Sequence, residues 1–277
     1  MEIRTIKSIA AASLTAFALA SCDSQTEWTT FNETYEQTLE QTDSADISVK
    51  HVVDYYKSLS AGKSARNKAN NAIVEFCFGD ANAKAGMSVE EASEADADSI
   101  MAAYQTDAGE VYESLLKDVA DGYCDENDIY YDVRWYDNTE GHFGDTYGDF
   151  QNYNVLSECY LGGAHGMYGI RTHIIDLKTG LAVTENAIFK PGYVQPVSDL
   201  IKEAMQKKYG SEGDPESQYS GMFHEYMLPN GNCGVSAEGV FWNYNPYEVA
   251  SYSEGIITVM VPWEALKPYI NPEVISL

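Results

Sequence analysis

The sequence contains few basic residues. Its 277 residues include 17 Lys+Arg against 43 Asp+Glu, which gives a formal net charge of −26 at pH 7. Nucleic-acid binding depends on concentrated positive charge at the phosphates, and electrostatic docking on an anionic membrane surface depends on it as well. The acidity therefore excludes both as main activities, and we expect no nucleic-acid partner.

Long apolar runs and the common catalytic motifs are also missing. No run of 18 apolar residues follows the N-terminal segment, so no membrane-spanning helix is expected in the exported chain. The phosphate-loop, GxSxG and HExxH motifs do not occur, and no EF-hand pattern is present. We predict no cofactor, no metal and no assigned catalytic residue; a calcium site among the acids between Asp125 and Asp145 stays open as an alternative.

Cysteine is scarce, and the first cysteine stands in a recognisable context. Two basic residues precede a short apolar stretch over residues 9–19, and Leu19-Ala20-Ser21-Cys22 follows. This pattern is typical of a bacterial lipoprotein signal, in which the peptidase cleaves before the cysteine and its thiol carries the lipid. We predict a signal peptide over 1–21, lipidation of Cys22 and attachment to a membrane of the cell envelope. An ordinary signal peptide is the alternative.

Four further cysteines have spacings that match no thiolate metal site. Export permits disulfides, and the four residues allow three pairings between which the sequence does not choose; buried thiols are the alternative. They are Cys77, Cys124, Cys159 and Cys233.

Composition and periodicity divide the exported chain into three parts. Residues 22–45 are polar and predict a tether, with a first strand at its end as an alternative. Residues 46–127 predict a helical N-terminal part, and 128–277 an α+β domain. Apolar residues at helical spacing predict a helix over 63–78. Ser88 and Glu91 form a capping box, which predicts a long helix to about Val119.

Later segments alternate between strand and helix patterns. Alternating apolar residues predict a strand over 129–136. Short connections favour antiparallel pairing, so the predicted fold class is α+β, with antiparallel sheets and packed helices. Further strands are expected over 152–161, 168–177, 238–244 and 256–261, with helices over 197–205 and 262–266; residues 47–56 suit either strand or helix.

The acidic residues are concentrated in one segment. Residues 88–128 contain 13 acids and a single base, Lys117. A solvated helix face explains such a run, and attraction of a cationic partner is the functional alternative.

A glycine-rich turn is the strongest local candidate for a site. Gly162, Gly163 and Gly166 allow a tight turn around His165. A histidine in such a turn can act as a base, a metal ligand or a docking residue; alternatively, its imidazole simply bonds a backbone carbonyl.

Two longer signatures resemble a known family of exported domains. One comprises the turn Leu161–Gly166, then Asp176-Leu177-Lys178-Thr179-Gly180 and Phe189-Lys190-Pro191-Gly192; the other is the stretch from Trp242 to Gly255. Together they resemble the extracellular domain of the lysozyme-sensing anti-sigma factor RsiV and the N-terminal module of PdaC-type peptidoglycan deacetylases, over about residues 45–270. Position 161 departs from the family's aromatic residue.

The resemblance implies a two-part binding unit rather than an enzyme. Its candidate binding residues are those of the two signatures: Gly162, Gly163, His165, Gly166, Tyr247, Glu248 and Tyr252. We therefore expect a lipid-anchored envelope protein that binds a peptidoglycan fragment or a cationic protein such as lysozyme. The alternative is a glycan- or peptide-acting hydrolase that uses His165.

Overall fold

The computed structural model describes residues 6–8, 26–38, 45–210 and 217–277. Most of the predicted signal peptide, and Cys22 with it, lies outside these residues. Among the helices of the described ranges, none is both long enough and apolar enough to cross a membrane.

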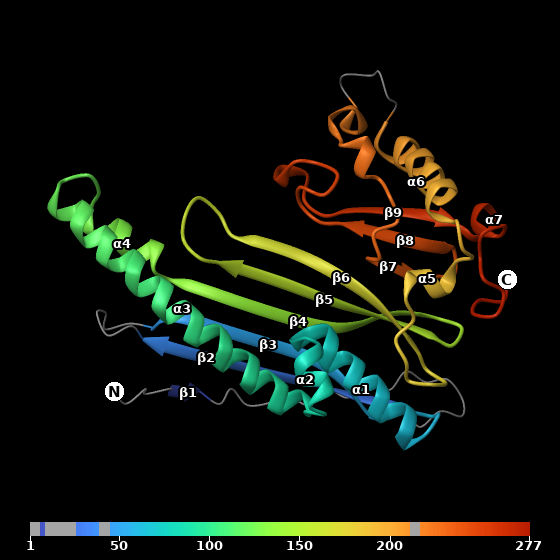
Figure 1. The fold of residues 1–277 in the computed structure, drawn as a ribbon, viewed down its shortest axis with the longest axis horizontal. Coiled ribbons are helices and arrows are strands. Elements are labelled where there is room, and N and C mark those ends of the chain that lie inside the picture. Colours follow the sequence, from blue (N-terminus) through green and yellow to red (C-terminus); the bar gives the residue numbers. More distant parts are fainter. Residues whose placement is uncertain (1–5, 9–25, 39–44, 211–216) are drawn as a thin grey trace. The chain divides into compact units, whose positions relative to one another are not determined.

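The strands form two sheets (Figure 1). The first contains, in spatial order, β1 (Ile6–Ser8), β2 (Glu27–Thr38), β3 (Ala45–Ser58), β4 (Trp135–Tyr147), β5 (Phe150–Tyr160) and β6 (Met167–Asp176). The second contains β7 (Cys233–Val235), β8 (Gly239–Tyr244) and β9 (Ile257–Pro262). The pairs β1–β2, β2–β3, β7–β8 and β8–β9 are antiparallel, whereas β3 and β4 run parallel. The predicted α+β class is confirmed.

The parallel pair explains where the N-terminal helices lie. Parallel neighbours need a long crossover, and helices fill the one between β3 and β4. They are α1 (Lys63–Phe78), α2 (Asp80–Lys84), α3 (Val89–Ala120) and α4 (Glu126–Asp132). The later helices are α5 (Glu185–Ile188), α6 (Val194–Tyr209) and α7 (Trp263–Leu266), with short 3₁₀ turns at Gln218–Gly221, His224–Tyr226 and Tyr252–Glu254.

The chain divides into two compact units that interleave along the sequence. Unit 1 comprises residues 1–60, 73–142 and 156–168, and unit 2 comprises residues 61–72, 143–155 and 169–277. The expected boundary at 127/128 lies inside unit 1, within α4. Each unit has its own hydrophobic core.

The core of unit 1 depends on α3, which lies along β2 and β3 (Figure 1). Its 32 residues make a helix about 48 Å long. The predicted capping box is present: Ser88 Oγ accepts the Glu91 N–H, and the Glu91 carboxylate accepts the Ser88 N–H. Ala97, Met101 and Ala108 are buried against Ile47 and Val49 of β3.

The core of unit 2 lies between α6 and the second sheet. Val197, Ile201 and Met205 repeat every four residues, which places them on one helix face, and all three are fully buried. They share a hydrophobic cluster with Trp242 of β8 and Val259 of β9. The predicted helix and both predicted strands are confirmed here.

The strand predicted over 129–136 was wrong. Residues 126–132 form α4 instead, and β4 begins only at Trp135. Ile129 and Val133 alternate with polar residues, but they are also four residues apart, and both are buried in the core of unit 1. The Asp125 N–H donates to Asp128, and Asp125 accepts the Asn127 N–H, so these acids cap the helix start.

The polar segment expected as a tether contains a strand. Glu27–Thr38 form β2, which pairs with β3 along its whole length. Tyr35 and Gln37 are buried although most of the segment is polar. The strand therefore spans much of the segment and not only its end, and composition did not mark its length because its inward residues are only partly apolar.

Candidate functional site

The glycine-rich turn connects β5 and β6 and lies in unit 1. Gly162 and Gly163 have φ angles of +84° and +86°, which side chains rarely adopt. A Cβ at Gly166 would stand 2.7 Å from the carbonyl oxygen of Cys159, so the neighbouring strand leaves no room for a side chain. The Tyr160 hydroxyl donates to the Gly163 carbonyl at 2.9 Å. Local backbone geometry thus explains the glycines.

His165 is exposed at the surface of this turn. Its Nδ1 lies 2.9 Å from the carbonyl oxygen of Gly166 and donates to it. This is the structural alternative raised by the sequence. Cys159, the nearest thiol in sequence, has a raised pKa because of burial and then because of the Asp137 carboxylate. A raised pKa disfavours the thiolate that nucleophilic catalysis needs.

The loop after β8 carries the second set of predicted residues and lies in unit 2. Tyr247 has φ +71° although it is not glycine, and its side chain is 53% exposed. Its ring lies 5.6 Å from that of Tyr252, measured between centroids. Glu248 accepts the Asn245 N–H at 3.0 Å, so its carboxylate fixes the loop. The loop presents two neighbouring tyrosines on a constrained backbone.

Asparagine side chains attach this loop to β6. The Oδ1 atoms of Asn245 and Asn232 accept the N–H groups of Ile170 and Thr172, both at 2.8 Å. Both amides also donate to the Ile170 carbonyl. These two side chains make the backbone hydrogen bonds that a neighbouring strand would otherwise make at this edge of the sheet. A polar cavity of about 170 Å³ adjoins them, lined also by Arg171 and Glu248.

Sequence reasoning missed these asparagines, although a signal was present. Asn230 and Asn232 stand two residues apart, as do Asn243 and Asn245. That spacing places amides on one face of an extended chain, where they can form hydrogen bonds with the backbone of an edge strand.

The two predicted sets of binding residues belong to different units. Gly162, Gly163, His165 and Gly166 lie in unit 1; Tyr247, Glu248 and Tyr252 lie in unit 2.

A histidine that the sequence did not single out links α3 to the sheet of unit 1. His51 Nδ1 lies 2.8 Å from Ser93 Oγ, and its Nε2 lies 3.3 Å from Asp96. The Tyr35 hydroxyl lies 2.9 Å from the same Ser93 oxygen. The order Ser–His–Asp matches a catalytic triad, but His51 and Ser93 are 0% exposed, so no substrate reaches the hydroxyl. The cluster is structural.

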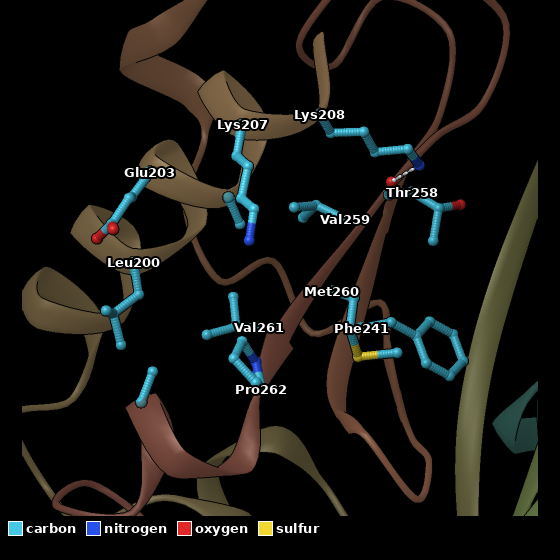
Figure 2. Close-up of a pocket in the computed structure, with 12 residues that line it drawn as sticks. Leu200, Glu203, Lys207, Lys208, Phe241, Thr258, Val259, Met260, Val261 and Pro262 are labelled. Atoms are coloured by element: carbon cyan, nitrogen blue, oxygen red, sulfur yellow. Dashed lines mark hydrogen bonds between the residues drawn. The ribbon is translucent and has the colours of Figure 1, made fainter.

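Unit 2 contains an apolar groove between α6 and β9 (Figure 2). Its volume is about 800 Å³. Apolar side chains from both elements line it, and Lys207 and Lys208 lie near the C-terminal end of the helix. Volumes of this order are typical of small-molecule sites.

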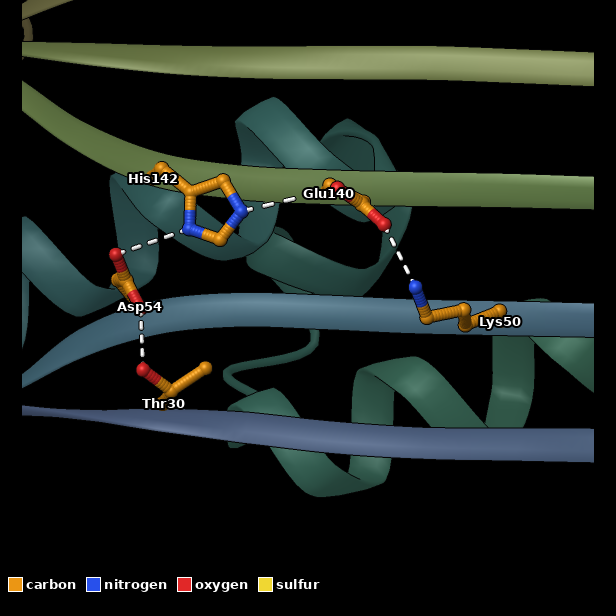
Figure 3. A network of polar contacts seen from close by, with 5 residues as sticks. All are labelled: Thr30, Lys50, Asp54, Glu140 and His142. Carbon is orange, nitrogen blue, oxygen red and sulfur yellow. Dashed lines mark hydrogen bonds and ion pairs between the residues drawn. The ribbon is translucent and has the colours of Figure 1, made fainter. Parts of the chain in front are cut away.

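Polar side chains on β2, β3 and β4 form a network in unit 1 (Figure 3). Asp54 accepts from the Thr30 hydroxyl at 2.6 Å and lies 3.1 Å from His142 Nδ1. Glu140 lies 3.9 Å from His142 Nε2 and accepts from Lys50 at 2.8 Å. The hydrogen bond to Asp54 raises the pKa of His142, despite partial burial that lowers it.

The exposed face of α3 is acidic. Asp107, Glu110 and Glu113 are exposed and make no hydrogen bond or ion pair with other described residues. Their carboxylates are therefore available to an external cation.

The described ranges contain neither a cluster of metal ligands nor a disulfide. No group of three or more His, Cys, Asp or Glu residues there is placed to hold a metal ion. The four cysteines of the described chain are thiols, and Cys233 is buried.

A family model matches part of the chain. The family model described as "Protein of unknown function (DUF3298)" matches residues 186–264. That range contains the Trp242–Gly255 signature and excludes the glycine-rich turn. No curated protein matches the sequence.

Two solved structures are similar over most of the chain. A DUF3298 family member from Bacteroides fragilis NCTC 9343 has a TM-score of 0.75 and 18% identity, covering 91% of this chain and 96% of its own. A DUF3298 family protein from Pseudomonas aeruginosa PAO1 has a TM-score of 0.55 and 11% identity, covering 89% and 95%. Residues 186–264 therefore match the DUF3298 family model, and the chain shares the fold of the Bacteroides fragilis family member.

Proposed function

We propose that this chain is a lipid-anchored, non-enzymatic protein of the cell envelope that binds a cationic, envelope-directed protein of the lysozyme kind. The sequence Leu19-Ala20-Ser21-Cys22 supports the anchor. The RsiV-type signatures support lysozyme as the class of partner.

The exposed acidic face of α3 is the observation on which this proposal rests. Among the described residues, Asp107, Glu110 and Glu113 have no hydrogen-bond or ion-pair partner, and the chain as a whole carries −26. Charged residues left unpaired on one face increase the association rate of an oppositely charged protein.

Binding is tested by titrating the purified protein with lysozyme over a salt series. We expect binding at low ionic strength that weakens steeply as salt is added, because screening acts on exposed charges. Lactalbumin, which has the lysozyme fold and an acidic surface, is the control partner. No binding of lysozyme at low salt would contradict the proposal.

The anchor is tested separately with Cys22→Ser. Cells that express the unchanged protein should incorporate labelled fatty acid into it, whereas the variant should take none. Equal labelling of both proteins would exclude Cys22 as the lipid attachment site.

A cell-wall ligand at the Tyr247–Tyr252 loop is the second candidate. Two neighbouring tyrosine rings beside a polar cavity suit a sugar, which stacks on aromatic faces and bonds to amides. Tyr247→Ala should then weaken the binding of muropeptides, whereas Tyr226→Ala, at another exposed tyrosine, should not. Equal binding by both variants would reject this site.

The hydrolase alternative is tested at His165. If the protein hydrolyses envelope glycans or peptides with this residue as base, His165→Ala abolishes turnover and keeps the fold. Because the imidazole is exposed and bound to a neighbouring carbonyl, we expect no turnover to lose.

A further inference from the structure

The groove between α6 and β9 combines an apolar wall with one basic side chain directed into it. Figure 2 shows Lys207 extending from α6 towards Val259 and Val261, whereas Glu203 points to the other side. Within the described chain, Lys207 makes no hydrogen bond or ion pair. Its ammonium group is therefore available to a ligand.

The neighbouring lysine has a different role. Lys208 Nζ donates to the Thr258 carbonyl at 2.7 Å, and the Tyr209 hydroxyl donates to the same oxygen at 3.3 Å. The Thr258 carbonyl at the outer edge of β9 therefore already accepts two hydrogen bonds from side chains of α6.

These contacts argue against an added peptide strand. β9 is an outer strand of its sheet, but its Thr258 carbonyl is bonded and Pro262 has no N–H to donate. Strand addition needs a row of open backbone groups. The edge offers few, so the side chains of the groove are its main binding surface.

The charged side chains of the groove further limit the class of ligand that it can bind. Three charged side chains of the described residues line the groove: Lys208 is bonded to the Thr258 carbonyl, Glu203 points to the other side, and Lys207 faces the apolar wall. An apolar chain would fill the wall, and an anionic head group would pair with Lys207.

We propose that this groove binds a single-chain anionic amphiphile, with its acyl chain along β9 and its head group at Lys207. The site belongs to unit 2 and is independent of the acidic face of α3. A carboxylate of a fatty acid and a phosphate of a lysophospholipid share this chemistry.

The proposal is tested by calorimetric titration of the purified protein with laurate below its micellar concentration. Saturable binding at one site is expected, about tenfold tighter than for decanoate, because two methylenes add apolar contact. Dodecyltrimethylammonium has the same chain length with a cationic head and should not bind at this site.

Lys207→Glu identifies the site. The charge reversal should weaken laurate binding at least tenfold and should permit dodecyltrimethylammonium to bind. Lys202→Glu makes the same change on the same helix, away from the groove lining, and should leave laurate affinity within twofold. Circular dichroism confirms that both variants fold.

Comparison with lauroyl lysophosphatidate separates the two sources. Tighter binding of this lipid than of laurate indicates a phospholipid source, and the reverse indicates free fatty acid; either result supports the site when Lys207→Glu removes it. Three results would overturn the proposal: no saturable laurate binding, equal laurate affinity in Lys207→Glu, or binding of an extended apolar peptide with none of laurate.

Discussion

The indole N–H of Trp242 donates a hydrogen bond of 2.8 Å to Glu185 Oε2 in the core of unit 2. The same oxygen accepts the Gly231 N–H at 3.0 Å, and Oε1 accepts the Tyr193 hydroxyl at 2.6 Å. Three donors thus compensate the burial of a carboxylate that is only 7% exposed. Burial, together with the hydrogen bond to Glu185, raises the pKa of the Tyr193 hydroxyl, so the hydroxyl keeps its proton and donates it in a hydrogen bond to the carboxylate.

Glu185→Ala should destabilise unit 2 by about 3 kcal/mol, because it leaves buried donors without acceptors. Glu185→Gln should cost about 1 kcal/mol, since one oxygen still accepts from Trp242 and Gly231. Urea unfolding followed by tryptophan fluorescence measures both changes. Equal losses in the two variants would show that the acceptor geometry contributes nothing.

Ser93→Ala should destabilise unit 1 by about 2 kcal/mol. The hydroxyl is the shared partner of Tyr35 and His51, and removing it deprives both buried groups of this hydrogen bond. Ser99→Ala, on the exposed face of α3, is the matched control and should change stability by less than about 0.5 kcal/mol. Chemical denaturation measures the free energy of unfolding of both variants, and equal losses in the two would contradict a stabilising role for the Ser93 hydroxyl.

The stability of unit 1 should depend on pH through His142. Its folded pKa is raised above its unfolded value near 6.5, so the contribution is complete below about pH 6.5. It is lost as pH rises through the folded pKa. Because the side chain is 46% exposed, screening keeps the change below about 1 kcal/mol.

His142→Gln removes this titration. The difference in unfolding midpoint between wild type and variant should be larger at pH 5.5 than at pH 8.5. His165→Gln, at an exposed histidine of the same unit, controls for general effects of the substitution. A difference that is constant with pH would reject the Asp54–His142 pair as the cause.

Cys233 should resist thiol reagents in the native protein. Burial, and then the nearby Glu185 carboxylate, raises the pKa of this thiol well above its usual value. Cys159 is only partly buried and should react faster at pH 8. Peptide mapping after timed alkylation measures both rates, and equal rates for the two residues would contradict the burial of Cys233.

Local signals predicted α3 and α6 correctly. The Ser88–Glu91 capping box of α3 and the spacing of Val197, Ile201 and Met205 in α6 are each encoded within a few residues. The same kind of signal was ambiguous at Ile129 and Val133, where spacings of two and four residues both fit; the Asp125 cap decides for the helix.

Contacts between distant residues were beyond sequence reasoning. His51 and Ser93 are 42 residues apart, and Glu185 and Trp242 are 57 apart. No periodicity relates such residues, because only the folded chain brings them together. The groove at α6 was missed for the same reason: each apolar residue on either side resembles an ordinary core position.

The central claim, that α3 recruits a cationic protein, is tested most directly by neutralising its exposed acids. The triple variant Asp107→Asn, Glu110→Gln, Glu113→Gln is compared with a control that neutralises three exposed acids of unit 2, Glu225→Gln, Glu238→Gln, Glu273→Gln. Both remove the same net charge. Lysozyme affinity at low ionic strength should fall about tenfold in the α3 variant and remain within twofold of wild type in the control. Equal affinity in both variants would contradict the assignment of the binding face to α3.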